Sequence, residues 1–550
     1  MQKKILSVLI AIVMILAIAP LSVFAEDDIS VYLYYEIIDG EVTVSGCNES
    51  INGDFLIPGT IEGYPVTKIA DDAFSGYKDL KSISIPDSVT EIGNDAFSDC
   101  ESLESVVIPN GVTKIEDRAF MGCRKLKNIS IPGSVTEIAN GTFADCESLE
   151  TVVISDGVAK ICNGAFQGCI SLKNVTISSS VTEIEATAFY YCTALENIVI
   201  PAGVESIGVE AFSLCLNLKS IEVDENNKYF SSSKDGVLFN KDKTAIILYP
   251  IGNSRTEYSI PDSVRSIEFA AFYFAKNLKN ITIPDSVETI GGGAFAGCYR
   301  LEEIVIPDSV TSTIGEQTFV SCINLKTVII GNGVTGIEEN AFSDCPVIEN
   351  VTIGENVEFI GEQAFASELG NIAMKKITIP ENVTRIDKGA FYFCNYLKEI
   401  NIYNPEMVIA ENSFYKAGIL DRDTYSRLVI DIYENRTKLD GLDQDLENKL
   451  VSELLAIVYQ IPDDELKDAV IYGYTGSTAE IYATENNMMF KELGEKITPD
   501  EEEDTTVPEI PKDDEEADSE TDFIGMIIKM FEKIIDFFTK IFSSLMNLFA

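Results

Sequence analysis

Residues 80–100 read LKSISIPDSVTEIGNDAFSDC, and this stretch decides the fold. Its phenylalanine returns along the chain, mostly at intervals of 23 residues, usually after Ala or Thr and often before a Cys or small residue three positions on. A fixed period of this size is typical of a solenoid, whose turns bury their apolar edges against neighbouring turns. The sequence therefore predicts one continuous interior column of rings: Phe74, Phe97, Phe120, Phe143, Phe166, Phe189, Phe212, Phe272, Phe295, Phe319, Phe342, Phe365, Phe391 and Phe414.

The quoted turn also predicts its own local structure. The apolar and polar residues of 80–85 are spaced as in a strand with three inward apolar residues. Pro86 ends this strand, because proline cannot donate a hydrogen bond to the ladder. Residues 89–92 predict a second short buried segment, and residues 96–100 a tight helical turn or loop that leads to the next strand.

The motif Leu-x-x-Ile-x-Ile-Pro-x-Ser-Val-Thr-x-Ile-Gly-x-x-Ala-Phe-x-x-Cys resembles the BspA-like leucine-rich repeat family of bacterial surface proteins, over roughly residues 50–420. The resemblance implies a β-rich solenoid, a right-handed coil of about fourteen 23-residue turns, and protein binding of the adhesion type. Residues 471–490 resemble the segment that closes such arrays, and the resemblance extends to an insertion at residues 224–257.

The N-terminal part predicts export and a cap. Residues 1–25 carry Lys3 and Lys4, an apolar run and Val-Phe-Ala, which predict a signal peptide cleaved after Ala25. Residues 26–56 alternate around Asp39-Gly40 and predict a capping hairpin over the first turn of a solenoid at residues 57–420.

The rest of the chain departs from the repeat. Within the insertion, residues 235–249 predict a β-hairpin, read as a structural strut in preference to a binding element. Residues 421–494 predict a small helical insert and a C-terminal cap. Residues 495–522 predict an acidic, disordered linker, since thirteen acids and one lysine lie between Asp500 and Asp522. Residues 523–550 predict an amphipathic helix.

Composition excludes several kinds of activity. The formal net charge is −48 without basic clusters, which excludes nucleic acid as a partner because phosphate binding needs Lys and Arg patches. The chain has no His, so catalytic triads and imidazole metal sites are absent, although paired carboxylates remain open. The acidic stretch 440–445 lacks EF-hand spacing. We therefore expect no enzyme activity, no metal and no cofactor.

Ten of the twelve cysteines lie three residues after a column phenylalanine. Metal ligation would need CxxC-like clusters, which do not occur, and in-register side chains run parallel where a disulfide needs them to face each other. Space-filling thiols are the preferred interpretation over disulfides. The predicted structural spine is Phe97, Phe120, Phe143, Phe166, Phe189, Phe212, Cys100, Cys123, Cys146 and Cys169.

The residue that follows the first leucine of each strand alternates between Lys and Glu, so the pattern repeats every two turns. Lys and Glu should stack one above the other in neighbouring turns, where opposite charges favour the register. The positions are Lys81, Glu104, Lys127, Glu150, Lys173, Glu196 and Lys219.

The predicted tail helix has polar residues spaced by three and four, and its charges in every turn forbid a membrane span. An interfacial membrane helix, a self-associating helix and a helix docked on the solenoid remain open, in that order of preference. The candidate membrane or partner contacts are Phe531, Ile534, Ile535, Phe538 and Phe542.

The predicted function is that of a secreted or cell-surface protein that binds host or microbial surface proteins without catalysis. The alternatives are a structural spacer on the cell envelope and a carboxylate-dependent hydrolase. A pocket with closely paired, non-repeat carboxylates would favour the hydrolase, and a smooth solenoid the other two.

Overall fold

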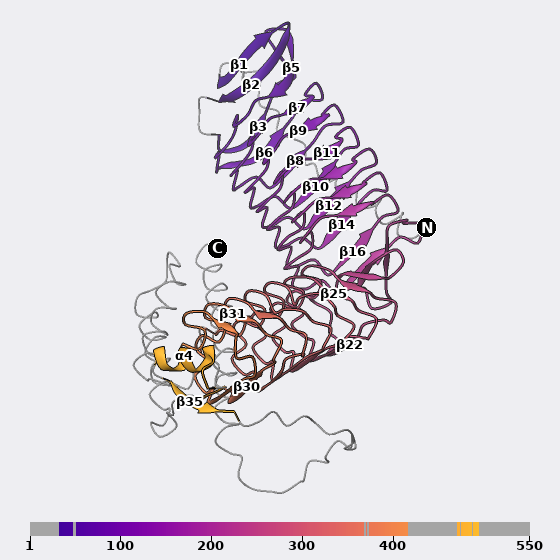
Figure 1. Ribbon diagram of the computed structural model, residues 1–550. Coiled ribbons are helices and arrows are strands. Elements are labelled where there is room, and N and C mark those ends of the chain that lie inside the picture. Colours follow the sequence, from indigo (N-terminus) through magenta and orange to yellow (C-terminus); the bar gives the residue numbers. More distant parts are fainter. Residues whose placement is uncertain are drawn as a thin grey trace, which may run out of the picture. The chain divides into compact units, whose positions relative to one another are not determined.

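The computed structural model describes residues 32–47, 51–367, 370, 373–415, 470–473, 475–486 and 488–493. Over these residues the chain is a β-solenoid of about 17 stacked turns with a single short helix, which confirms the predicted β-rich solenoid (Figure 1). The count exceeds the predicted fourteen because some turns, at the ends and at Tyr249, lack the repeat phenylalanine. The predicted signal peptide, acidic linker and tail helix, and most of the helical insert, lie outside the described residues.

Most turns give one strand to a long ladder and one to a short ladder. In the first coil, residues 51–223, the long ladder follows the leucine strand: β3 (Gly53–Leu56), β6 (Leu80–Ser84), β8 (Ser105–Val107), β10 (Asn128–Ile131), β12 (Thr151–Ile154), β14 (Asn174–Thr176), β16 (Asn197–Ile200) and β18 (Ser220–Val223). The short ladder holds β5 (Tyr64–Ile69), β7 (Glu91–Ile92), β9 (Lys114–Ile115), β11 (Glu137–Ile138), β13 (Lys160–Ile161), β15 (Glu183–Ile184) and β17 (Ser206–Ile207).

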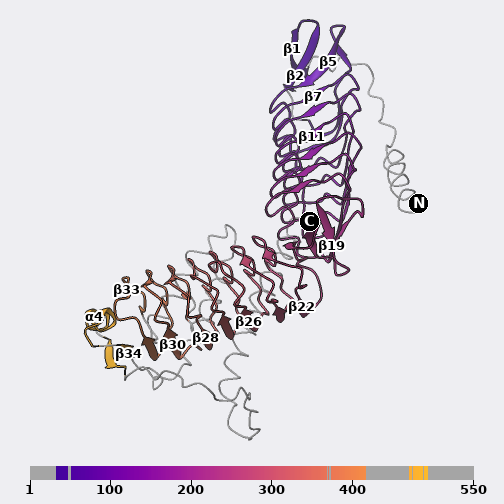
Figure 2. The same ribbon diagram turned by 45° about the vertical axis from the view of Figure 1, so that its right-hand side comes forward.

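The second coil runs from β22 to residue 493. Its long ladder comprises β22 (Glu257–Ser259), β24 (Asn280–Thr282), β26 (Glu303–Ile306), β27 (Thr327–Ile330), β28 (Asn350–Thr352), β30 (Lys376–Ile379), β32 (Glu399–Ile402), β34 (Val470–Gly473) and β35 (Met489–Glu492). Its short ladder comprises β23 (Ser266–Ile267), β25 (Thr289–Ile290), β29 (Phe359–Ile360), β31 (Arg385–Ile386) and β33 (Val408–Ile409). Figure 2 shows the long-ladder strands in a row along this coil, with α4 (Thr478–Glu485) at its end.

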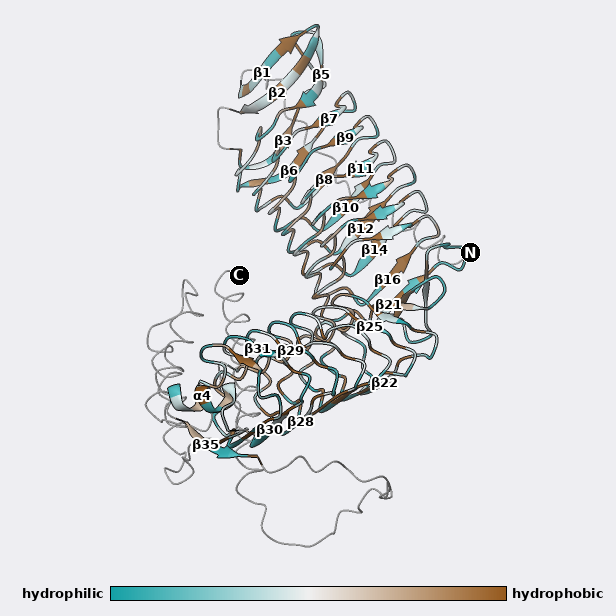
Figure 3. Ribbon diagram, in the orientation of Figure 1, coloured by the Kyte–Doolittle hydropathy of each residue, from teal (hydrophilic) through white to brown (hydrophobic). Residues whose placement is uncertain are grey.

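The register of the ladders equals the sequence repeat. Ile129 pairs with Val152, and Val152 pairs with Val175, all in parallel strands. Like residues therefore lie on like residues, and the inward positions of successive strands form continuous apolar rows. Hydrophobic and hydrophilic stretches accordingly alternate along each turn (Figure 3).

The phenylalanine rings are buried, but they form two columns and not the one column that the sequence predicted. The first column runs from Phe74 to Phe212 with centroids 5.1 to 5.5 Å apart. The second begins with Tyr249 on Phe272, 5.1 Å apart, and continues to Phe414 at spacings of 5.0 to 5.3 Å. These spacings match the distance between neighbouring strands.

The insertion causes this division. It contains three antiparallel strands, β19 (Phe230–Ser232), β20 (Leu238–Asn240) and β21 (Ala245–Leu248), of which the sequence predicted the last two as a hairpin. Residues alternate sides along a strand, so Leu238 belongs to the first core while Val237 and Phe239 belong to the second. The insertion thus forms a wall shared by two hydrophobic cores.

Both ends of the described solenoid are closed by irregular turns. At the N-terminal end β1 (Leu33–Ile38) and β2 (Glu41–Cys47) form an antiparallel hairpin, and β2 pairs in parallel with β5, which β4 (Thr60–Ile61) also flanks. At the other end, helix α4 is capped by Ser477, whose hydroxyl accepts from the Glu480 N–H. The Tyr482 ring lies 5.9 Å from Phe414 and covers the last ring of the second column.

Candidate interaction surface

The predicted spine residues are interior in every case. Phe97, Phe120, Phe143, Phe166, Phe189 and Phe212, together with Cys100, Cys123, Cys146 and Cys169, expose at most 3% of their surface. They hold the turns together and are inaccessible to a ligand.

The cysteine thiols have a structural role in this column. The Cys100 Sγ donates to the Phe74 carbonyl oxygen at 3.1 Å, and Cys123 donates to Phe97 in the same way at 3.2 Å. All twelve cysteines are buried with free thiols. Burial raises the pKa of the Cys100 thiol to about 12, so the nucleophilic thiolate is scarce at neutral pH.

Among the described residues, no group of three His, Cys, Asp or Glu side chains is arranged to hold a metal ion. Over the same residues, no helix has the length and apolar character needed to cross a membrane. The surface of the coils is therefore the candidate site for a partner.

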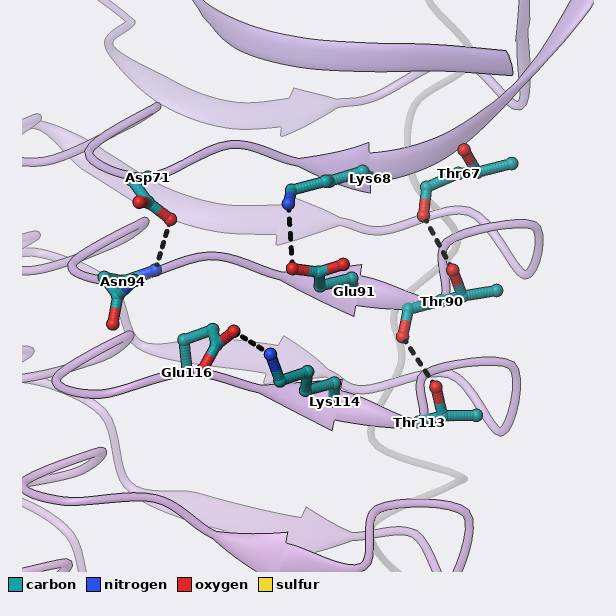
Figure 4. Close-up of polar contacts among 9 residues, drawn as sticks. All are labelled: Thr67, Lys68, Asp71, Thr90, Glu91, Asn94, Thr113, Lys114 and Glu116. Atoms are coloured by element: carbon teal, nitrogen blue, oxygen red, sulfur yellow. Dashed lines mark hydrogen bonds and ion pairs between the residues drawn. The ribbon is translucent and has the colours of Figure 1, made fainter. Parts of the chain in front are cut away.

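The outer side of the short ladder is a network of polar pairs that join neighbouring turns (Figure 4). Lys68 Nζ lies 2.8 Å from Glu91 Oε1, and the Asp71 carboxylate accepts from the Asn94 N–H at 2.8 Å. Lys114 forms an ion pair with Glu116 within its own turn. The charged and polar groups in these pairs therefore find their partners within the coil itself.

Threonine hydroxyls on this side of the coil also join neighbouring turns. Thr90 Oγ1 donates to the Thr67 carbonyl oxygen, and Thr113 Oγ1 donates to that of Thr90, both at 3.2 Å (Figure 4). The repeat threonine therefore tethers each turn to the previous one.

Among the described residues, two of the charge pairs that the sequence predicted for the long ladder are ion pairs. Lys219 lies 2.9 Å from Glu196, and Lys173 lies 3.6 Å from Glu150. These side chains are about half exposed, so each pair contributes no more than about 1 kcal/mol. Their main effect is to fix the stacking register, and they carry little information about a partner.

One edge of the coils departs from the repeat. We define the loop edge as the two positions that follow each column phenylalanine. In most turns the second of these positions has positive φ, and in many turns it is Gly or Asp, such as Gly122 and Asp145. Bulky residues are unusual there because a left-handed conformation brings Cβ close to the backbone. The exceptions are Tyr191 (φ 60°), Leu214 (φ 56°), Phe274 (φ 56°) and Phe393 (φ 59°).

A bulky residue in this conformation costs about 1 to 3 kcal/mol. Stacking of the turns does not require it, because glycine, aspartate or serine occupies this position in other turns. Three of the exceptions, Tyr191, Phe274 and Phe393, each follow a tyrosine. The pairs Tyr190-Tyr191 and Tyr273-Phe274 lie on the loop edge on the two sides of the insertion.

The loop edges on the two sides of the insertion are joined by hydrogen bonds. Within the first coil, the Tyr191 N–H donates to the Ser213 carbonyl oxygen at 3.0 Å. Across the insertion, Lys276 Nζ donates to the Leu216 carbonyl oxygen at 3.1 Å. The Gly252 N–H donates to the Leu218 carbonyl oxygen at 2.7 Å. A Cβ on Gly252 would lie 2.4 Å from the Asn217 carbonyl carbon, so this close approach requires glycine.

Tyr190, Glu210 and Tyr273, which we call the junction cluster, influence one another electrostatically across the insertion. Burial raises the pKa of Tyr273, and the nearby Tyr190 and Glu210 raise it further. Burial also raises the pKa of Tyr190, again with a contribution from Glu210. The charge of Glu210 thus raises the pKa of two tyrosines that belong to different coils.

Exposed aromatic side chains occur on both sides of the insertion. Tyr191 is 40% exposed and Phe269 is 55% exposed. The Tyr273 ring packs edge-on against Phe274 at 4.6 Å, which in turn packs against Tyr299 at 5.3 Å. Rings of the second coil therefore pack against one side of Tyr273.

Sequence reasoning missed the junction cluster. It judged the surface by the outward strand positions, which are small and polar, and it did not examine the residues after the column phenylalanines. The available signal was the doubling of aromatics in AFYY at 188–191 and AFYF at 271–274, although AFYF occurs again at 390–393, away from the insertion. The predicted tail contacts, Phe531, Ile534, Ile535, Phe538 and Phe542, lie outside the described residues.

Comparison with known proteins agrees with this architecture. The family model described as "BspA type Leucine rich repeat region (6 copies)" matches residues 61–171, 136–234, 252–372 and 369–436. No curated protein matches the chain.

Solved structures show the same fold. The crystal structure of a leucine rich cell surface protein from Faecalibacterium prausnitzii A2-165 is 32% identical, with a TM-score of 0.53 over 70% of this chain and 95% of the other. A leucine-rich repeat protein from Bacteroides ovatus ATCC 8483 is 23% identical, with a TM-score of 0.51 over 86% of this chain and all of the other. The second likeness concerns the fold alone.

Proposed function

The chain belongs to the BspA-type leucine-rich repeat family, and from that premise we propose that it is an exported protein that binds other proteins at a cell surface without chemical turnover. The observation that carries the proposal is the filling of the interior. Both coils are packed with the repeat's own Phe, Leu, Ile and Cys side chains, so the long outer surface is what the coils offer to a partner.

The electrostatic character of that surface supports a protein partner over a nucleic acid. The chain carries 89 acidic and 41 basic residues, and basic residues of the short and long ladders are held in ion pairs with neighbouring acids. An acidic surface repels phosphate groups and attracts basic protein surfaces.

Export is proposed from the first 25 residues. The likeness to a protein named as a cell surface protein supports it, and the basic, apolar and small-residue regions have the order found in signal peptides. If the proposal is right, the mature chain begins at Glu26, which N-terminal sequencing of the secreted protein would show.

Binding is tested by capture with the exported chain, residues 26–550, immobilised on beads. We expect it to retain specific proteins from detergent-solubilised host and microbial surface fractions, and the same chain unfolded in urea to retain none of them. Capture by both forms alike, or by neither, would contradict a binding function of the folded coils.

Adhesion is a separate step of the proposal, and it needs whole cells. Beads coated with the folded chain should attach to cells that display the captured protein, and soluble chain should compete for the attachment. A chain that captures no protein and attaches to no cell, yet stays on the envelope, would leave the spacer role in its place.

A further inference from the structure

Resting on the proposed function, we propose that strand β1, at the N-terminal end of the first coil (Figure 1), binds an extended basic segment of the protein partner. The segment adds to the sheet as one more strand. It pairs with the outer edge of β1 through backbone hydrogen bonds and places an Arg or Lys opposite Glu36.

Strand β1 is the last strand of its sheet. Among the described residues this sheet runs in the order β1-β2-β5-β7-β9, so β1 has a strand neighbour on one side only. The capping hairpin therefore covers the end of the first core but leaves a strand edge, and such an edge can pair with another chain. Soluble proteins often protect an edge strand with Lys or Pro, and β1, with the sequence LYYEII, has neither.

The geometry of the hairpin identifies the open backbone groups. Ile38 pairs with Glu41 across the two-residue turn Asp39-Gly40, in which both residues have positive φ, so this pair carries the closing hydrogen bonds. Bonded and non-bonded pairs alternate along an antiparallel ladder, so the N–H and C=O of Ile37 point to the outer edge. Neither group has a hydrogen-bond partner among the described residues. The one register shift of the hairpin adds Ser45 to β2 and leaves β1 regular.

The solvent face of β1 sets the side-chain pattern of the segment. Tyr34, Glu36 and Ile38 alternate along the strand and are exposed, Tyr34 by 57% and Ile38 by 60%. Tyr64 is also exposed, and its ring lies at the hairpin turn, 3.6 Å from where a Cβ on Gly40 would be. Exposed apolar groups gathered in this way mark an interaction site. Opposite residues of neighbouring strands share a face, so the segment places apolar side chains opposite Tyr34 and Ile38.

Charge complementarity selects a basic segment over a second copy of this chain. Residues 26–67 contain nine acids and no Lys or Arg. Among the described residues the Glu36 carboxylate makes no hydrogen bond or ion pair, whereas the Glu41 carboxylate accepts from the Thr67 hydroxyl at 3.0 Å. Two copies paired through β1 would bring these acids together, and like charges opposite each other destabilise strand pairing. A basic segment is attracted by the same charges.

The test is a titration of the exported chain, residues 26–550, with the fluorescein-labelled peptide Lys-Thr-Val-Thr-Arg-Thr-Val-Thr-Lys. Fluorescence anisotropy at physiological salt measures the binding. The peptide sequence is the same in both directions, so parallel and antiparallel pairing both place its Arg opposite Glu36 and its two Val opposite Tyr34 and Ile38. Its Thr residues favour the extended conformation. We expect saturable binding of one peptide per chain.

A second peptide separates strand addition from charge attraction. Replacing the two Thr beside the Arg by Pro keeps the charge of the peptide but removes the N–H donors that face the edge of β1. This peptide should bind about tenfold more weakly, since two hydrogen bonds are lost. Equal binding of the two peptides would overturn strand addition, because attraction to an acidic chain would then be sufficient.

Variants of the chain locate the edge. Ile37→Pro removes the outward N–H of β1 and leaves the hydrogen bonds to β2, so the first peptide should bind about tenfold more weakly. Glu36→Gln should weaken binding about two- to fivefold. Glu104→Gln removes the same charge from an exposed position beside the long ladder and should leave binding almost unchanged. If Ile37→Pro does not fold, the proline peptide with the parent chain gives the same comparison.

Three further results would overturn the inference. Equal weakening by Glu36→Gln and Glu104→Gln, with no effect of Ile37→Pro, would mean that the peptide senses only the overall charge. A dimer in sedimentation that Ile37→Pro abolishes would mean that a second copy occupies the edge. Binding that appears only after deletion of residues 26–31 would mean that the chain's own N-terminal segment occupies it.

The titration uses no surface protein, so it is independent of the capture experiment. A chain that captures no surface protein fails the proposed function but leaves the peptide result readable. A folded Ile37→Pro chain that captures the partner as well as the parent chain does overturns this inference alone.

Discussion

At the scale of single residues, the ring of Phe166 shows what holds a turn in place. It is fully buried, with its centroid 5.5 Å from that of Phe143 and 5.3 Å from that of Phe189. Replacing Phe166 by Ala leaves a cavity in the column, so we expect the free energy of unfolding to fall by about 3–5 kcal/mol. Urea denaturation followed by circular dichroism measures this, and a loss below about 1 kcal/mol would mean that the ring is poorly packed.

The cysteine column makes a prediction about pH. The pKa of the Cys100 thiol is raised from 9.0 to about 12 by burial, and that of Cys394 likewise to about 12. Between these values the unfolded chain loses protons that the folded chain keeps. The stabilisation is therefore complete below about pH 9 and is lost as pH rises towards 12, by about 1.4 kcal/mol per pH unit for each such thiol.

The measurement is the urea midpoint as a function of pH. We expect a flat profile from pH 7 to about 8.5 and a steep fall above it, less steep in the variant Cys100→Ala. A midpoint that stays constant up to pH 10.5 would show that the thiols titrate normally and are not buried.

Residues that obey the repeat could be predicted from the sequence, and residues that break it could not. Phe97 and Cys100 recur in turn after turn, so their burial follows from the period alone. Tyr190, Glu210 and Tyr273 each look like a local variation of the repeat. Their electrostatic influence on one another depends on how the insertion joins the two coils, and no periodic pattern carries that information.

At the scale of elements, strand β20 also shows which features can be predicted from the sequence and which cannot. Its hairpin with β21 follows from the alternating sequence and the turn at Asn240, whose side-chain oxygen accepts from the Thr244 N–H at 2.8 Å. The run Val237-Leu238-Phe239 is apolar on both faces, which predicts burial on both faces. The sequence does not show that the two faces belong to separate cores.

This division predicts opposite effects for two neighbouring residues. Leu238→Ala should destabilise the first coil and Phe239→Ala the second, because each side chain is buried in a different core. The cost should be about 2–5 kcal/mol in each case. Hydrogen exchange read by mass spectrometry reports each coil separately, with each variant serving as the control for the other. Equal loss of protection in both coils for both variants would mean that they unfold as one cooperative unit.

At the scale of the whole molecule, the tail prediction stays open because residues 523–550 lie outside the described residues. If they form an attachment helix, their deletion should release the protein into the medium or abolish its assembly, while the melting temperature of the coils stays the same. The reason is that an apolar stripe of this size marks a membrane or partner surface. Liposome flotation and sedimentation distinguish the two modes of attachment. A chain with the tail that stays monomeric and binds no lipid would leave docking on the coils.

The central claim for the whole molecule is that the folded coils bind a protein and leave it chemically unchanged. The most direct measurement combines a binding isotherm for the captured surface protein with intact mass spectrometry of that protein after prolonged incubation with the exported chain. The account predicts a saturable, stoichiometric complex and a partner of unaltered mass. A partner whose mass changes with turnover, or the absence of any saturable complex, would contradict it.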